Sequence, residues 1–477
     1  MSVDTPTKAI REQQPVWELL RVLAGGTQEI RKHPEYLPQQ ERESAKDYKI
    51  RLSRACLYPA VMMTVNSLTG RAFDNAPAFE GVPEWVAKEV EPDIDRARSS
   101  MALFLPRFFQ DGVLNGWSAV LVESPKFADQ VTVQEATDGR IHPYLLLKHA
   151  HEFLEVKRDS AGTDILRVRV KFTEEVEDPD TFESTTVNVI RVYRKGEDGV
   201  SVQRYVEKKN NEGKLVYVPE PVVKLPVSRI PIVFFYANFT DHGIGVPPCR
   251  EIAFMNVLHY QLMSSYVTIC DVAMIPIIAL IGADKTTELV IGSRSAVRIS
   301  NPQGKIEFAE HTGAAMKTGK ELIADLKHDM REAGAKLLLP DEGTGNKTAT
   351  QATDDSRKEN SPFSLMVARF EESCQNLYAM IGEWRGESVE VKVTMRANLK
   401  PDFMPADTMS TIVNLHDRNL ISALTVYEEA RRRNVVGGTR TWAEEEVLIG
   451  EDGDGYLIAS VKAKATVADK NPAQNSA

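Results

Sequence analysis

A glycine and lysine stretch contains the first residues in this sequence whose types and spacing could do chemistry. GAAMKTGKE, residues 313–321, has the composition of a phosphate-binding loop. That loop needs four residues between its glycines and a serine or threonine after its lysine, because the hydroxyl ligates magnesium. Here five residues separate the glycines, and Glu321 follows Lys320. The spacing argues against nucleotide binding, and we interpret the lysines as the solvated face of a helix.

Histidines and carboxylates offer two candidate metal sites. HEFLE (151–155) begins like a zinc-protease motif, but Glu155 stands where the second histidine belongs. His149 and His151 have a spacing that zinc can use on a strand, yet no third ligand is near in sequence, which favours surface histidines. The acidic stretch EDGDGYL (451–457) lacks the ligand spacing of a calcium loop and is interpreted as a turn.

Candidate nucleophiles, cysteines above all, are the remaining residues that could catalyse a reaction. The four cysteines (Cys56, Cys249, Cys270 and Cys374) lie far apart in apolar contexts without a C-x-x-C pair, so we expect buried, reduced thiols and neither zinc nor disulfides. No G-x-S-x-G motif occurs, and no other nucleophile has a base close by in sequence. The sequence therefore predicts a protein that is not an enzyme and uses no cofactor or metal.

Composition limits the class of protein. Of the 477 residues, 42% are hydrophobic and 26% charged, as in ordinary globular proteins, and the net charge of −10 argues against general attraction to nucleic acid or anionic membranes. The first residues lack the apolar core of a signal peptide. The longest apolar stretch, Val272–Ile281, is interrupted by Pro276 and is far shorter than the roughly 20 residues of a membrane span. We expect a soluble, cytoplasmic protein of two to four domains.

Two helices are predicted between residues 46 and 77, and they open the part of the chain that we expect to fold. A Tyr-Pro step at residues 58–59 separates them, since proline disfavours helix in the residue before it and starts a new helix well. The first helix is charged, with Arg51 and Arg54 expected to face solvent or a neighbouring copy. The second is expected to end near Gly70 and to bury an apolar stripe at helical spacing. That stripe is Val61, Val65 and Leu68.

An α+β domain is predicted over residues 46–245, after a polar N-terminal segment (1–45) with one short helix. Six runs alternate apolar and polar residues, which is typical of strands. These runs are 117–124, 142–149, 165–172, 185–194, 201–208 and 231–238.

Two helices of similar length, 246–272 and 314–336, bracket a small β-rich module at 273–313. We expect them to pack antiparallel, with Leu262 and Leu326 in the contact. On the first helix the expected packing stripe is Met255, Leu258, Leu262, Tyr266 and Ile269, and the expected wetter face is Asn256, Tyr260, Ser264 and Thr268. On the second helix the expected stripe is Leu322, Leu326, Met330 and Ala333.

The C-terminal part is predicted to contain a long polar loop, a long helix and two shorter helices. Residues 340–360 are almost free of apolar side chains, and Ser361-Pro362 then form a helix start. A strand is expected within 387–402 and helices at 407–417 and 422–433. The last residues, 460–477, are polar and expected to be disordered.

Five short motifs give the chain a family resemblance. They are R-L-S-R-A-x-x-Y-P (51–59), T-V-N-S-L-T-G-R-A-F (64–73), G-I-G-V-P-P (243–248), N-V-L-H-Y-Q (256–261) and S-R-K-E-N-S-P-F (356–363). Over about residues 40–440 the chain resembles portal proteins of tailed double-stranded DNA bacteriophages, in a branch with a portal-like domain.

The resemblance implies a ring, usually of twelve subunits, at one vertex of the capsid. It implies a wing (46–245), stem helices (246–272 and 314–336), a clip (273–313), a tunnel loop with a long helix (337–386), a wing strand (387–402) and a crown (403–459). Such a ring conducts DNA during packaging and ejection. The implied partners are the terminase packaging motor, the major capsid protein, the scaffolding protein and a head-tail adaptor, with no membrane partner. The implied location is the virion, after assembly in the host cytoplasm.

Six basic residues are candidates for weak, non-specific contacts to double-stranded DNA in such a channel. They are Lys347, Arg357 and Lys358 near the polar loop, and Lys317, Lys320 and Lys327 in the second stem helix. Twelve copies would carry a formal charge of about −120, which suits a conduit that must not hold DNA tightly. Two alternatives stay open: a monomeric or small-oligomer adaptor of the virion, and a nucleotide- or metal-dependent DNA-processing enzyme.

Overall fold

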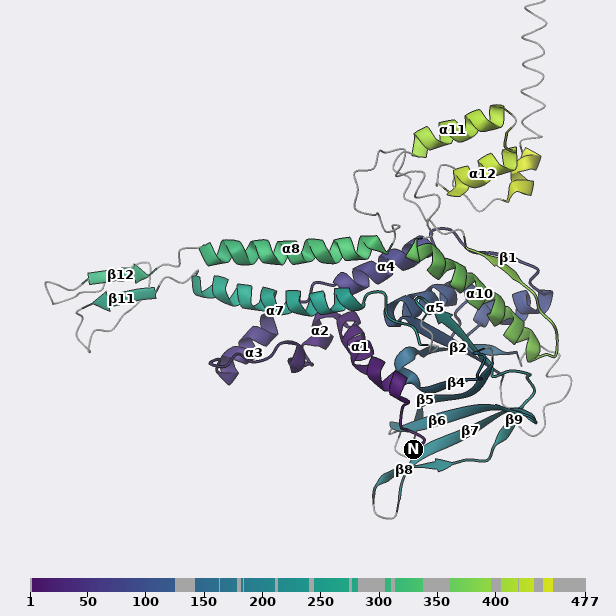
Figure 1. Ribbon diagram of the computed structural model, residues 1–477, viewed down its shortest axis with the longest axis horizontal. Helices are drawn as coiled ribbons and strands as arrows, with labels where there is room; N and C mark the ends of the chain where they lie inside the picture. Colours follow the sequence, from purple (N-terminus) through teal and green to yellow (C-terminus); the bar gives the residue numbers. More distant parts are fainter. Residues whose placement is uncertain are drawn as a thin grey trace, which may run out of the picture. The chain divides into compact units, whose positions relative to one another are not determined.

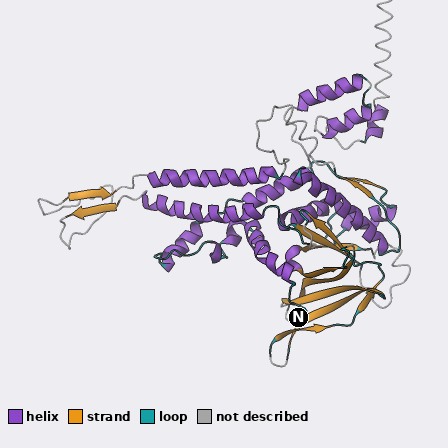
Figure 2. Cartoon of the chain, viewed as in Figure 1, coloured by secondary structure: helices purple, strands orange, loops and turns teal. Residues whose placement is uncertain are grey.

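The computed structural model contains two compact units, residues 1–399 and 400–477. It describes residues 2–124, 142–162, 164–177, 182, 184–210, 213–239, 244–273, 277–281, 305–309, 314–337, 361–395, 405–418, 420–432 and 441–448. The fold of the first unit is α+β, as the sequence predicts (Figures 1 and 2).

Helices of the first unit surround its larger core. Besides two long helices described below, the structure shows α1 (Lys8–Ala24), α2 (Gly26–Ile30), α3 (Ala45–Arg54), α4 (Ala60–Ala72), α5 (Met101–Asn115) and α10 (Pro362–Glu383) around it. The prediction that the first 45 residues precede the folded part is wrong, because α1 is integral to the core. Trp17 and Leu20 are fully buried, and the Trp17 indole Nε1 donates to the carbonyl of Asn115 at 3.0 Å.

Two antiparallel sheets form the β part of the unit. The three-stranded sheet has the order β10-β2-β3 and the six-stranded path has the order β4-β5-β6-β7-β8, with β9 also paired to β7. Their bounds are β2 (Trp117–Glu123), β3 (Tyr144–His149), β4 (Phe153–Arg158), β5 (Ile165–Glu177), β6 (Ser184–Gly196), β7 (Gly199–Lys209), β8 (Leu215–Pro219), β9 (Val223–Leu225) and β10 (Ile232–Tyr236). All six predicted runs contain strands, whereas β4, β8 and β9 were not predicted.

Aromatic side chains join the helices to the three-stranded sheet. Phe108 and Phe109 of α5, Phe235 of β10 and Phe370 of α10 have ring centroids 5.0–5.9 Å apart. Gly112 makes this approach possible, because a Cβ there would lie 2.3 Å from Cδ1 of Phe235. The helix α10 begins as predicted: Ser361 caps it by accepting from the Ser364 amide at 3.1 Å. A short pair, β1 (Ala78–Glu80) with β13 (Lys392–Thr394), includes the strand expected within 387–402.

The two helices around the Tyr-Pro step differ from the sequence prediction in two details. Arg51 does not face solvent: its guanidinium is buried and makes two 2.7 Å bonds to the Glu43 carboxylate. Helix α4 continues two residues past Gly70 and ends at Ala72. Its apolar stripe is buried as expected.

A helical hairpin follows β10. It consists of α7 (Arg250–Ala273), strands β11 (Ile277–Ile281) and β12 (Lys305–Ala309), and α8 (Ala314–Lys336). The strands pair antiparallel from Ile277 opposite Ala309 to Ile281 opposite Lys305 (Figure 1). We call these four elements the hairpin. Its helices lie close to the predicted ranges, and residues 282–304 between the strands lie outside the described residues.

The second unit contains α11 (Pro405–Asp417) and α12 (Ala423–Arg432), near the two helices predicted there. The predicted tail, 460–477, lies outside the described residues. Within the described parts of both units, no helix is both long enough and apolar enough for a membrane span.

Candidate functional site

The two helices of the hairpin, α7 and α8, pack along one another, and α8 presents one buried face. Ile323, Leu326 and Met330 of α8 are buried at steps of three and four residues, which places them on one face. Gly319 lets the ring of Tyr266 rest on the helix, because a Cβ at residue 319 would lie only 3.2 Å from Cδ2 of Tyr266. The predicted antiparallel packing of the helices is present.

Tyr58 holds the root of the hairpin. Its carbonyl accepts from the Asn256 amide at 2.8 Å, and its hydroxyl oxygen accepts from Nε of Arg331 at 3.3 Å. The Lys327 ammonium lies 4.6 Å from the centre of the Tyr58 ring, and the His259 ring lies 5.5 Å from it. The residue that breaks the helix in the sequence is thus the residue that joins α4, α7 and α8.

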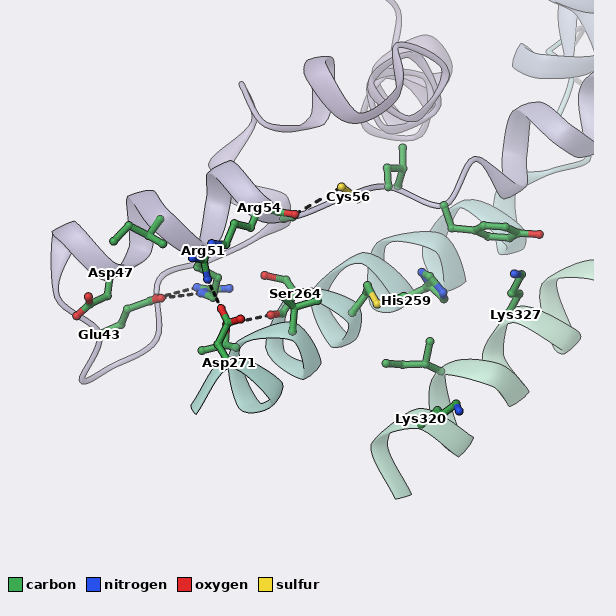
Figure 3. A pocket seen from close by; sticks show the side chains of 18 of the residues that line it. Glu43, Asp47, Arg51, Arg54, Cys56, His259, Ser264, Asp271, Lys320 and Lys327 are labelled. Carbon is green, nitrogen blue, oxygen red and sulfur yellow. Dashed lines mark hydrogen bonds and ion pairs between the residues drawn. The ribbon is translucent and has the colours of Figure 1, made fainter. Parts of the chain in front are cut away.

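A cavity of about 730 Å³ lies beside this root, and we call it the groove. Figure 3 shows that α3 and the following linker form one side, α7 the middle and α8 the other side. Apolar side chains from all of these segments line it: Ile50, Leu57, Met263, Val267 and Ile323. The groove is therefore built mainly for apolar contact.

Two ion pairs fix the α3 side of the groove. The Arg51 guanidinium donates to Glu43 and holds the pKa of that carboxyl below its usual range. Arg54 is exposed, as predicted, and pairs with Asp271 near the end of α7. These pairs connect α3 to the segment just before it and to the end of α7.

The α8 side of the groove is basic. Lys320 is exposed at its edge, and Lys327 is half-buried under Tyr58. Neither lysine has a carboxylate within ion-pair distance among the residues that the structure describes. Burial, followed by the charge of Lys327, lowers the pKa of His259, so this imidazole is neutral at pH 7.

Several polar atoms at the base of the groove have no hydrogen-bond partner in the described part of the chain. Ser264 is 3% exposed and His259 is 2% exposed, and both the Ser264 hydroxyl and Nδ1 of His259 are unpaired. Buried polar groups are nearly always hydrogen-bonded in folded proteins. The groove thus has two features of a binding surface, apolar walls and a basic edge on the α8 side.

The packing face of α7 agrees only in part with the prediction: Tyr266 of the expected stripe packs on α8 and Thr268 of the expected wetter face is exposed, but other residues are exchanged. Asn256, Tyr260 and Ser264, expected on a wetter face, are buried against the rest of the unit. Leu258 and Ile269, expected in the packing stripe, are 47% and 42% exposed. This exchange arises because the inner face of α7 meets polar atoms such as the Tyr58 carbonyl. Leu258 and Ile269 of the apolar stripe therefore stay exposed.

An apolar ridge is left on the hairpin. We define it as Phe254, Leu258 and Ile269 of α7 with Leu322 of α8, whose exposed fractions are between 42% and 50%. Of the predicted contact residues, Leu326 is 9% exposed, whereas Leu262 is only half-buried beside the ridge.

The predicted DNA-contact residues fall into two groups. Lys347, Arg357 and Lys358 lie outside the described residues. The three lysines of α8 are described: Lys317 is 81% exposed and lies 4.0 Å from Glu321, while Lys320 and Lys327 line the groove.

Where the structure describes them, the motifs considered for catalysis lie in ordinary secondary structure. Residues 314–321 of the lysine stretch form the first turns of α8 rather than a loop. His149 ends β3, its Nδ1 lies 2.6 Å from Asp111, and its ring stacks on His151 at 5.4 Å. In the described ranges no three histidine, cysteine or acidic side chains converge as metal ligands. The expectation of buried thiols holds for Cys249 and Cys374 but not for Cys56, which is exposed.

Sequence reasoning missed the groove and the role of Tyr58. The signal for the groove was weak, because α3 lies about 200 residues before α7 and only the fold brings them together. The ridge had a visible signal, the apolar stripe itself, but the stripe was assigned to contacts within the chain.

Comparisons with known proteins come from families, curated proteins and solved structures. A family described as a domain of unknown function (DUF4055) matches residues 248–385. No curated protein matches the chain. A chain from the neck of an empty GTA particle with C6 symmetry is 13% identical, with a TM-score of 0.40, covering 80% of this chain and 91% of that chain.

Two further solved structures are similar at the same level. A chain from the virion of the native gene transfer agent (GTA) particle is 13% identical, with a TM-score of 0.39, covering 84% of this chain and 97% of that chain. A chain from the neck of the native GTA particle with C12 symmetry is 13% identical, with a TM-score of 0.39, covering 80% and 91%. The chain is thus similar at low identity to chains of gene transfer agent particles, and its residues 248–385 match the DUF4055 domain.

Proposed function

We propose that this protein is a portal-like subunit that assembles into a ring at a capsid vertex and conducts double-stranded DNA. The observation that supports this most strongly is the hairpin: two packed helices with a strand pair at the far end, and an apolar ridge that the described residues do not cover. Apolar side chains exposed in a row mark a surface for another protein. The sequence motifs that resemble those of phage portal proteins indicate that this assembly is a portal-like ring.

The proposed parts follow the elements. Residues 46–245 with 387–402 form the wing, α7 and α8 the stem, β11 and β12 part of the clip, α10 the long helix after the tunnel loop, and α11 and α12 the crown. The terminase, the major capsid protein, the scaffolding protein and a head-tail adaptor are proposed as partners from the sequence resemblance.

DNA contact in this proposal is weak and local. The net charge of −10 per chain keeps a ring from holding phosphates firmly, because tight binding requires many lysine and arginine contacts. Lys347, Arg357 and Lys358 are the proposed contacts from the loop, with Lys317 from α8.

Light scattering on the purified protein tests the proposal. A ring has a mass about an order of magnitude above the 53.2 kDa of one chain. A mass of one or two chains at micromolar concentration and physiological salt, under every assembly condition tried, contradicts it and favours a small adaptor. An assay for ATP hydrolysis on the same sample separates a structural role from a nucleotide-dependent enzyme.

A further inference from the structure

The two faces of the hairpin are complementary to one another. Counting about 100° per residue along α7 from Leu258, Phe254 and Ile269 lie within about 40° of it. His259, Met263 and Val267 of the groove lie about 100° to 180° away. The ridge and the groove therefore occupy opposite sides of the same helix.

The charges on α8 divide in the same way. From Leu322 on the ridge, Asp325 and Asp329 lie within about 60° and are exposed. Lys320, Ala324 and Lys327 lie about 140° or more from Leu322 and line the groove. One side of the hairpin is thus apolar with acidic residues on α8, and the other is an apolar cavity whose α8 side is basic.

We propose that the ridge of one copy docks into the groove of the next copy, so that the hairpins join head to tail. This inference rests on the proposed function and names the surfaces through which its subunits meet. Leu258 and Leu322 enter the apolar part of the groove, and Asp325 and Asp329 approach Lys320 and Lys327 of the neighbouring copy.

Head-to-tail contact has a geometric consequence. Each copy uses two different surfaces, so the interface repeats around an axis and closes into a ring, or continues as a filament. An isologous contact, in which the same patch meets itself, stops at two copies. Like charges would also meet in that case, because each ridge carries its own aspartates. The inference places Lys320 and Lys327 at a protein contact rather than at DNA.

A mixing experiment with two variants tests this. The ridge variant is Leu258→Glu with Leu322→Glu, and the groove variant is Lys320→Glu with Ala324→Glu. All four positions are exposed, so both variants are expected to fold, with circular dichroism and melting like those of the wild-type chain. Leu103→Glu, at a 64% exposed leucine of α5, and Lys209→Glu are matched controls that should form wild-type rings.

Native mass spectrometry then gives the number of copies. Each variant alone should be a monomer, and an equal mixture should form a complex of two copies, because one intact ridge meets one intact groove. Wild-type rings from either variant, or a mixture that stays monomeric, overturn the docking inference while the wild-type ring still supports the proposed function. If the wild-type chain itself does not assemble, both are wrong.

Discussion

Tyr58 illustrates how much one side chain contributes to placing the hairpin. Its backbone carbonyl, hydroxyl and ring each contact a different partner, on α7 or α8. In the sequence, the only indication of a special role for Tyr58 was that it precedes a proline. A residue that breaks a helix exposes its backbone groups, and here those groups receive side chains from elements about 200 and 270 residues further along the chain.

Substitution of Tyr58 should separate the ring from the hydroxyl. Tyr58→Ala removes the ring contacts to His259 and Lys327 and is expected to lower the free energy of unfolding by about 2–3 kcal/mol. Tyr58→Phe removes only a long hydrogen bond and should cost less than about 1 kcal/mol. Urea unfolding gives both values, and equal losses in the two variants would show that the ring is not what anchors the root.

His149 and His151 predict opposite effects of pH. The hydrogen bond to buried Asp111 raises the pKa of His149, so its protonated ring stabilises the fold below its ordinary value of about 6.5, and this is lost as pH rises through the folded pKa. Burial, and then the charge of His149, lower the pKa of His151, so protonation of His151 destabilises the fold as pH falls below about 6.5.

Unfolding measured at several pH values checks both signs. The stability lost in His149→Gln should be larger near pH 6 than near pH 9. His151→Gln should gain stability over the wild-type chain as pH falls from about 7 to about 5. Parallel pH profiles for the two variants would contradict the assigned roles.

At the scale of elements, periodicity located the helices and strands and the buried stripe of α4, but not the whole inner face of α7. The helix at 314–336 and the strand runs are where the sequence predicts them, because apolar spacing and caps are local properties. The packing face of α7 was predicted only in part, because the prediction assumed that the helix buries its whole apolar stripe within the chain. Leu258 and Ile269 depart from that assumption, whereas Asn256 and Ser264 take the inner positions. Helix α1 was not predicted to join the core, because its many charged residues obscure the apolar pattern to which Trp17 and Leu20 belong.

The two leucines of α8 should respond differently to a charge. Leu326→Asp places a carboxylate on the buried face and is expected to cost about 3–5 kcal/mol of unfolding free energy. Leu322→Asp, on the exposed ridge, should change it by less than about 0.5 kcal/mol but should weaken assembly. Leu262→Asp, which is half-buried, should fall between them.

Urea unfolding in the background of the groove variant allows this comparison on single chains. If Leu322→Asp destabilises the single chain as much as Leu326→Asp, the ridge is part of the monomer core and not a contact surface.

At the scale of the whole molecule, the polar segment 340–360 is proposed to contact DNA in transit. Deleting residues 343–347, which lie outside the described residues, should leave ring assembly nearly intact while reducing the amount of DNA that particles package or retain. Substituting Arg357 and Lys358 by alanine should act in the same direction. Particles that package and retain DNA like the wild type would remove this loop from the channel.

The proposed function depends on many copies forming one ring with a hole through it. Negative-stain electron microscopy of the purified chain tests it most directly, because a channel is visible without any prior structure. The account predicts rotationally symmetric particles with a central opening, from the wild-type chain and from Leu103→Glu, and no such particles from the ridge variant. Wild-type particles without an opening, or single chains in every field, would contradict it.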